Sequence, residues 1–151
     1  MPKTISKDTP LAEITLRRYE KPYSTKKRDI TRKLCLSIGL LQPGDSRDVI
    51  VDVLSVLLKH KKRKKLLSSD DITSLVIKER KKQKLPMKGI ASSNIRRQLK
   101  RLKDIHLIEN TKNKYRISEF EDLDTIFDKK IKNFYLNNII ERVEDYFKAI
   151  K

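Results

Sequence analysis

The stretch SSNIRRQLKRLKDIHLIE, residues 92–109, combines cationic side chains with a narrow apolar stripe. Five Arg and Lys residues precede its first acidic residue, and Ile95, Leu99 and Leu102 recur among them at steps of four and three. A helix turns about 100° per residue, so these three side chains lie within a sector of about 60°. The opposite side carries Ser93, Arg97, Lys100 and Arg101. We therefore expect a helix that packs against a core on one side and contacts a charged partner on the other.

The charge of the whole chain indicates the sign of that partner. Its 151 residues include 37 Lys and Arg against 20 Asp and Glu, so the formal net charge is +17. This excess is larger than solubility requires, and an anionic polymer or surface is the natural partner for it. Two alternatives stay open: the lysines keep the protein soluble, or they reflect the Lys and Glu enrichment of heat-adapted proteins.

Length and composition favour one compact, mainly α-helical domain with extensions, to which the pattern of residues 105–118 adds a small β-hairpin. The chain has 37% hydrophobic residues, only three glycines and no tryptophan. Cys35, the single cysteine, stands among apolar neighbours and is expected to be a small buried side chain. We expect a cytoplasmic protein, because no signal peptide or membrane-spanning run appears and a lone cysteine suits a reducing compartment.

The first 44 residues are expected to form a helical extension. Thr9 can cap a helix in TPLAEITLRRYEKP, although the alternating apolar residues there would also suit a short strand. A second helix is expected from Lys26 to a break at Pro43 and Gly44. Its apolar positions are Ile30, Leu34, Ile38 and Leu41.

Residues 45–118 are expected to form the central domain, which contains the basic helix. Asp45 or Ser46 can cap its first helix, with Asp48 in the first turn. The apolar face of that helix comprises Val49, Ile50, Val53, Leu54, Leu57 and Leu58. The helix runs into HKKRKK, residues 60–65, which can be a solvated helix end, a phosphate-contacting patch or a nuclear targeting tract.

Two further helices and a hairpin complete this domain. Serine and aspartate caps begin a helix in LLSSDDITSLVIKERKK, which must stop before Pro86. After the basic helix, residues 92–105, the stretch IHLIENTKNKYRIS predicts two short strands, at 107–109 and 114–117, around a polar turn at 110–113.

In this order of elements the chain resembles the winged helix-turn-helix domains of archaeal and bacterial transcription regulators. The stretch SSNIRRQLKRLKDIHLIENTKNKYRIS is similar to the family's third helix, closing turn and wing, and the whole resemblance covers about half of the chain. It implies that the third helix enters the major groove of DNA by its N-terminal part, while the wing contacts the backbone or the minor groove. The family usually has glycine at the closing turn, where this sequence has His106, a residue type that tolerates a left-handed backbone better than most.

The resemblance makes double-stranded DNA the expected partner, transcriptional regulation the expected function and the nucleoid the expected location in the cytoplasm. The residues expected to contact DNA lie on the third helix and on the wing. They are Ser92, Ser93, Asn94, Arg96, Arg97, Lys100, Arg101, Lys112, Asn113 and Lys114. Among them, Arg97 is the candidate for a base edge and Lys100 for a phosphate.

Residues 119–151 are expected to form C-terminal helices, with Ser118 as the cap of the first. A later apolar stripe can pack on the core or pair with its copy in a homodimer, which would suit a two-fold operator. The stripe consists of Leu136, Ile139, Ile140, Val143, Tyr146, Phe147 and Ile150.

No enzyme chemistry is expected. His60 and His106 lie far apart in the sequence and lack the neighbouring ligands of a metal site, and no phosphate-binding glycine loop or nucleophile motif occurs. We therefore expect no cofactor, metal or small-molecule ligand. Two further functions stay open: an RNA-, ribosome- or chromosome-associated winged helix protein with little base selectivity, and a protein-interaction module whose charge is incidental.

Overall fold

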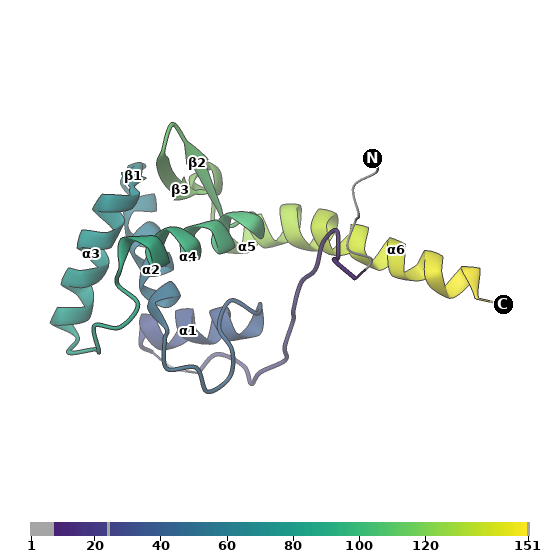
Figure 1. Ribbon diagram of the computed structural model, residues 1–151, viewed down its shortest axis with the longest axis horizontal. Coiled ribbons are helices and arrows are strands. Elements are labelled where there is room, and N and C mark those ends of the chain that lie inside the picture. The colour runs from purple at the N-terminus through teal and green to yellow at the C-terminus, as the bar shows by residue number, and fades with distance from the viewer. Residues whose placement is uncertain (1–7, 24, 151) are drawn as a thin grey trace, which may run out of the picture.

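The computed structural model describes residues 8–23 and 25–150, and it shows a helical body from which a long helical rod projects (Figure 1). The body is mainly helical with a small three-stranded antiparallel sheet, which confirms the fold class at this level. Its elements are α1 (Lys27–Ser37), α2 (Val49–Lys61), β1 (Leu67–Ser68), α3 (Ser69–Lys82), α4 (Ser92–Asp104), β2 (Ile108–Thr111) and β3 (Lys114–Ile117). A short turn, η1 (Ser118–Phe120), leads to the rod, which consists of α5 (Leu123–Ile126), η2 (Phe127–Tyr135) and α6 (Leu136–Ala149). Within the described ranges, no helix combines the length and the apolar composition needed to cross a membrane.

The core of the body surrounds α2, whose apolar side chains are almost all buried. The face predicted from the sequence is buried except for Leu58, which is half-buried. The core cluster also includes Cys35 of α1 and Ile131 of the rod, so it draws on residues outside 45–118. Burial raises the pKa of the Cys35 thiol to about 12, and this side chain behaves as the small buried hydrophobe that was predicted.

The sheet has the strand order β1-β3-β2, with all neighbours antiparallel. Lys112 and Asn113 form a two-residue turn between β2 and β3, and their φ angles of 51° and 63° are typical of a tight type I′ hairpin. The hairpin confirms the predicted pair of strands, although its turn is shorter than the predicted 110–113. Strand β1 was not predicted, because two residues carry no readable alternation.

The starts of α2 and α3 differ in how they are capped. Ser68 and Asp71 form a capping box on α3, because the Ser68 hydroxyl accepts from the Asp71 N–H at 3.1 Å and the Asp71 carboxylate accepts from the Ser68 N–H at 3.2 Å. The predicted caps of α2, Asp45 and Ser46, were wrong, since its N-cap residue is Asp48. Asp48 makes no side-chain cap because its carboxylate pairs with arginines instead.

The predicted helix near Thr9 was wrong, because residues 8–23 form no helix and no strand. Arg17 instead fastens this segment to the end of α1. Its backbone N–H donates to the Ser37 carbonyl at 2.8 Å, and its guanidinium donates to the carbonyls of Leu36 at 2.8 Å and Leu41 at 3.2 Å. Tertiary hydrogen bonds here outweigh the weak local helix signal.

Helix α1 ends at Ser37, earlier than the predicted break at Pro43 and Gly44. Gly39 adopts a φ of +77° immediately after this end, and a Cβ at that position would lie 2.6 Å from the Cβ of Thr15. The left-handed backbone and the close approach of Thr15 therefore both require glycine.

Ser118 was predicted to cap the first C-terminal helix, and this prediction was wrong. Its hydroxyl donates to the carbonyl of His106 at 2.8 Å, and its N–H donates to the carbonyl of Leu107 at 3.0 Å. The helical rod begins only at Leu123, after the N-cap residue Asp122. Ser118 therefore fastens the closing turn of α4 to the end of β3.

Lysine and histidine occupy left-handed positions at three helix ends, namely Lys64, Lys84 and His106. At the end of α4, the N–H of His106 donates to the Lys103 carbonyl and that of Leu107 to the Leu102 carbonyl, which is a Schellman motif. The φ of 68° at His106 confirms the left-handed turn expected there.

We expect Lys84→Gly to raise the free energy of unfolding by about 1 kcal/mol, because Lys84 is exposed and glycine removes the steric cost of its left-handed backbone. Lys78→Gly, an equally exposed change inside α3, should lower it by about 1 kcal/mol. Urea unfolding of both variants measures the difference. Equal destabilisation by the two changes would contradict this interpretation of the helix end.

Candidate nucleic-acid interface

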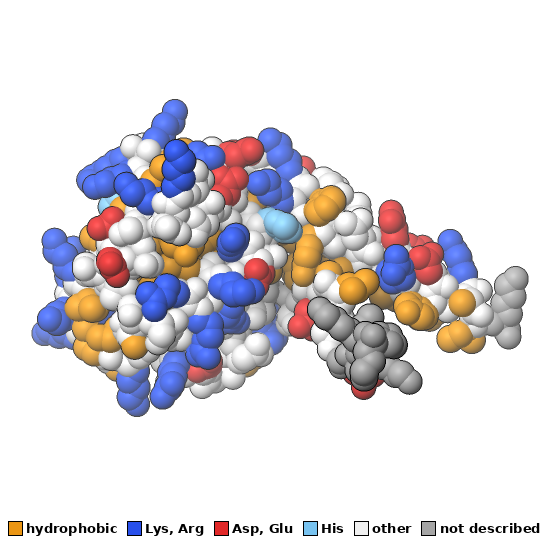
Figure 2. Space-filling model, turned by 45° about the horizontal axis from the view of Figure 1, so that its top comes forward, with side chains coloured by type: hydrophobic (Ala, Val, Ile, Leu, Met, Phe, Trp, Pro, Cys, Tyr) orange, Lys and Arg blue, Asp and Glu red, His pale blue; other side chains and the backbone are white. Residues whose placement is uncertain are grey.

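Helix α4 has the two-sided character that its spacing predicts. Ile95, Leu99 and Leu102 are fully buried against the body. The exposed residues of the helix are Ser92, Ser93, Arg96, Arg97, Lys100, Lys103 and Asp104. In Figure 2, Lys and Arg side chains outnumber Asp and Glu side chains over the body. The buried stripe thus holds a cationic surface toward solvent.

The cations of this surface make only weak contacts within the chain. Lys100 pairs with Asp104 at 3.0 Å, but the two side chains are 74% and 57% exposed. Such an exposed pair contributes little to stability, so Lys100 can exchange it for a phosphate. Arg97 donates one hydrogen bond, of 3.1 Å, to the Asn94 side chain, which leaves most of its donors unused.

Asn94 and Arg101 lie differently from the other predicted contact residues, because both are half-buried and bonded within the chain. The Asn94 amide donates to the carbonyl of Gly89 at 2.7 Å and thereby fixes the turn before α4. Arg101 donates to Gln98 at 2.8 Å and to the carbonyl of Gly39 at 3.4 Å, toward the end of α1. These two side chains therefore help to position α4, and they are less available to a partner than its exposed residues.

The predicted hairpin residues Lys112, Asn113 and Lys114 are all exposed at its tip. Pairing of β3 with β1 sets Lys114 opposite Ser68, shortly after the end of the HKKRKK block. Hydrogen bonds with Ser68 lower the pKa of Asp71, and the positive charges of Lys65 and Lys114 lower it further. Both lysines therefore lie near one carboxylate, and the pairing of β1 with β3 places the block beside the hairpin.

Residues 62–65, which we call the basic turn, were not among the ten residues expected to contact DNA, although a phosphate-contacting patch was one interpretation of the HKKRKK block. All four are exposed, and none of them pairs with an acidic side chain within the described parts of the chain. The run of like charges was visible in the sequence, but its place beside the hairpin depends on strand β1.

Positive charge is concentrated in the middle of the chain. Residues 59–116 hold 20 of the 37 Lys and Arg but only five of the 20 Asp and Glu, which makes their net charge +15. Residues 117–151 hold six basic and eight acidic residues, a net charge of −2. The charge of the protein is therefore a property of α3, α4, the basic turn and the hairpin.

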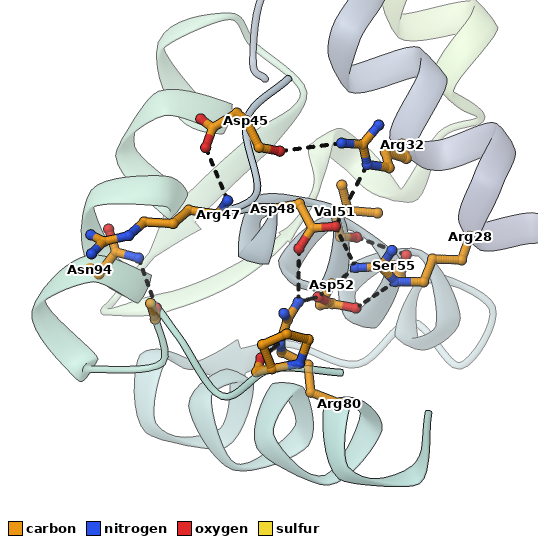
Figure 3. Close-up of polar contacts among 12 residues, drawn as sticks. Arg28, Arg32, Asp45, Arg47, Asp48, Val51, Asp52, Ser55, Arg80 and Asn94 are labelled. Carbon is orange, nitrogen blue, oxygen red and sulfur yellow. Dashed lines mark hydrogen bonds and ion pairs between the residues drawn. The ribbon is translucent and has the colours of Figure 1, made fainter. Parts of the chain in front are cut away.

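A largely buried ion-pair network links α1, the start of α2 and α3 (Figure 3). Arg28 of α1 and Arg80 of α3 point toward Asp48 and Asp52 at the start of α2, with nitrogen-to-oxygen distances of 3.1 to 3.2 Å for Arg28. Burial would raise the pKa of Asp48, but Arg28 and Arg80 outweigh burial and lower it. Arg80 also donates to the carbonyl of Pro86 at 2.8 Å, which fixes the connection that leads into α4.

Both histidines make contacts within the protein. A ring nitrogen of His60 lies 2.9 Å from the carbonyl oxygen of Val56, and His106 packs edge-on against Phe134 and Tyr135. The described residues contain no group of three or more His, Cys, Asp or Glu that could hold a metal ion. In comparisons with models of protein families, with curated proteins and with solved structures, the chain matches none of them.

Proposed function

We propose that this protein is a winged helix-turn-helix DNA-binding protein, and that it regulates transcription by reading duplex DNA with α4 and its basic hairpin. The observation that carries the proposal is the construction of α4, in which a fully buried apolar stripe presents Ser93, Arg96 and Arg97 at the exposed N-terminal half. The helix closes at His106 and continues directly into a hairpin with lysines at its tip. Serine hydroxyls suit phosphates, and arginine suits both phosphates and guanine edges.

Duplex DNA is favoured over single strands because α4 exposes no aromatic side chain on which a base could stack. A second function, sequence-independent coating of RNA or chromosomal DNA, is favoured by the charge of +15 over residues 59–116. A surface that contacts many phosphates at once binds strongly without reading bases.

Binding measurements on three nucleic acids distinguish these functions. Fluorescence anisotropy would compare a genomic promoter pool, random duplex DNA and structured RNA at two salt concentrations. A transcription regulator is expected to select a subset of promoters over random duplex by a factor of at least about 10³. Equal affinity for all three, with a steep salt dependence, would favour the coating function.

Within the proposed interface, Arg97→Ala should cost about 1–3 kcal/mol on the preferred site and much less on random DNA, if Arg97 contacts a guanine edge. Lys100→Ala should weaken both by similar factors and lower the salt slope by roughly one unit, because it removes one phosphate contact. Lys148→Ala, an exposed lysine of α6, is the matched control and should change neither. If a folded double variant, Arg97→Ala with Lys100→Ala, binds duplex DNA as tightly as wild type, the exposed side of α4 is not a DNA-binding surface. That result would favour the protein-interaction module.

A further inference from the structure

Helix α6 carries a row of large apolar side chains that nothing described in this chain covers. Not one of its 14 residues is buried. Its large apolar side chains from Ile140 to Phe147 are between 45% and 76% exposed, and Ile150, the residue that follows the helix, is 82% exposed. The sequence left open whether this stripe packs on the core, and over residues 140–150 it does not.

The spacing of the stripe is that of a coiled-coil seam. Leu136, Ile140, Val143, Phe147 and Ile150 are separated by four, three, four and three residues. This regular repeat places one side chain per turn along a narrow line, which a second helix of the same repeat can interlock with. Ile139 and Tyr146 widen this apolar face on one side of the line.

The rod extends away from the body, so the described part of the chain has little with which to cover α6 (Figure 1). The N-terminal segment reaches the rod at Tyr135, whose hydroxyl donates to the Glu13 carbonyl at 2.9 Å and accepts from the Glu13 N–H at 3.2 Å. Tyr135 is the last residue of η2. The stripe begins just beyond this contact.

We propose that α6 pairs with α6 of a second copy of this chain to form an antiparallel homodimer. An aromatic side chain buries about 150–250 Å². The stripe exposes two aromatic and three smaller aliphatic side chains, so it offers on the order of 600 Å² of apolar surface. That approaches the ~800 Å² per partner of a standard interface and reaches the upper range of apolar patches on monomers. The interaction concerns the rod alone and does not rest on the proposed DNA binding.

The side chains that flank the seam select the antiparallel orientation. Ile139 and Tyr146 lie on the same side of it, one heptad apart. In an antiparallel pair with Ile140 level with Val143 of the second copy, Ile139 faces Tyr146, apolar against apolar. In a parallel pair, Ile139 would face Glu144 of the second copy.

Charge and position favour the same orientation. Each body carries a strong positive charge, whereas residues 117–151 carry −2, so the rods can approach where the bodies repel. Antiparallel rods place the two bodies at opposite ends.

The test is the oligomeric state of the full chain in the absence of nucleic acid. Sedimentation over a wide concentration range should show a dimer of 17.8 kDa chains. A variant with Val143→Lys and Phe147→Lys should dimerise at least about a hundredfold more weakly, because it places four charges in the seam. The matched control, with Asn138→Lys and Ala149→Lys, adds the same charge at exposed positions off the seam and should remain a dimer. Circular dichroism checks that both variants keep their helices.

Cross-linking tests the orientation. In an antiparallel pair Leu136 is level with Phe147 of the second copy, whereas Leu136 of one chain lies about 16 Å along the axis from Leu136 of the other. Leu136→Cys and Phe147→Cys should therefore cross-link when mixed and not alone, and the fully buried Cys35 should not interfere. A monomer at high micromolar concentration, a dimer that the seam variant leaves intact, or cross-linking of each cysteine variant only with itself would overturn the proposal.

Discussion

Asp52→Ala is expected to lower the free energy of unfolding by about 3–5 kcal/mol. Asp52 is 1% exposed and accepts hydrogen bonds from Arg28 and Arg80. Alanine would leave the buried Arg80 guanidinium with only the partly exposed Asp48 as a carboxylate partner, and a buried cation with incomplete pairing is costly. Urea unfolding monitored by circular dichroism measures the change.

Asp128→Ala is the control for this prediction, since Asp128 is exposed on the rod and forms no ion pair with the described residues. We expect it to change the free energy of unfolding by no more than about 0.5 kcal/mol. Because Arg80 also fixes Pro86, the Asp52 variant should loosen the connection into α4 as well. A loss below about 1 kcal/mol for Asp52→Ala would mean that the network contributes little to the fold.

Replacing all four residues of the basic turn, 62–65, by glutamine is expected to lower the affinity for duplex DNA by two to three orders of magnitude at about 0.1 M salt. Each phosphate contact releases counterions and contributes about 0.9 to the slope of log affinity against log salt. If all four cations contact phosphates, the slope should fall by about 3.6. Titrations of random duplex at several salt concentrations give both quantities. The reason to expect contact is that Lys65 lies two residues before strand β1, which pairs with the hairpin strand that carries Lys114.

A second quadruple variant removes the same charge from the rod. It replaces Lys129, Lys132, Arg142 and Lys148 by glutamine. This variant should lower the salt slope by less than one unit, because its cations lie outside the proposed interface. Equal losses of DNA affinity in both variants would show that the net charge of the protein matters and the position of the cations does not. An unchanged affinity in the variant of residues 62–65 would show that the basic turn is only a solvated helix end.

The sequence by itself determined the elements whose signals are local. Ile95, Leu99 and Leu102 are buried because their spacing matches the helix turn, so α4 and its cationic surface could be predicted. The hairpin followed from its polar turn residues, whereas the left-handed turn at His106 was implied by the family resemblance and is a backbone that histidine tolerates. Eight of the ten residues expected to contact DNA are exposed on α4 or the hairpin: Ser92, Ser93, Arg96, Arg97, Lys100, Lys112, Asn113 and Lys114.

The tertiary structure decided whatever depends on partners distant in the sequence. Arg17 holds the N-terminal segment extended through bonds to residues about 20 positions away, and no local signal contains that information. Arg80 looks like a surface cation in the sequence, yet it is buried because Asp48 and Asp52, 32 and 28 residues earlier, neutralise it. Strand β1 exists only because β3 pairs with it, and this pairing is what brings the basic turn to the hairpin. Local periodicity reports which side of an element is apolar, but the partner of a charge or of a strand edge is set by chain folding in three dimensions.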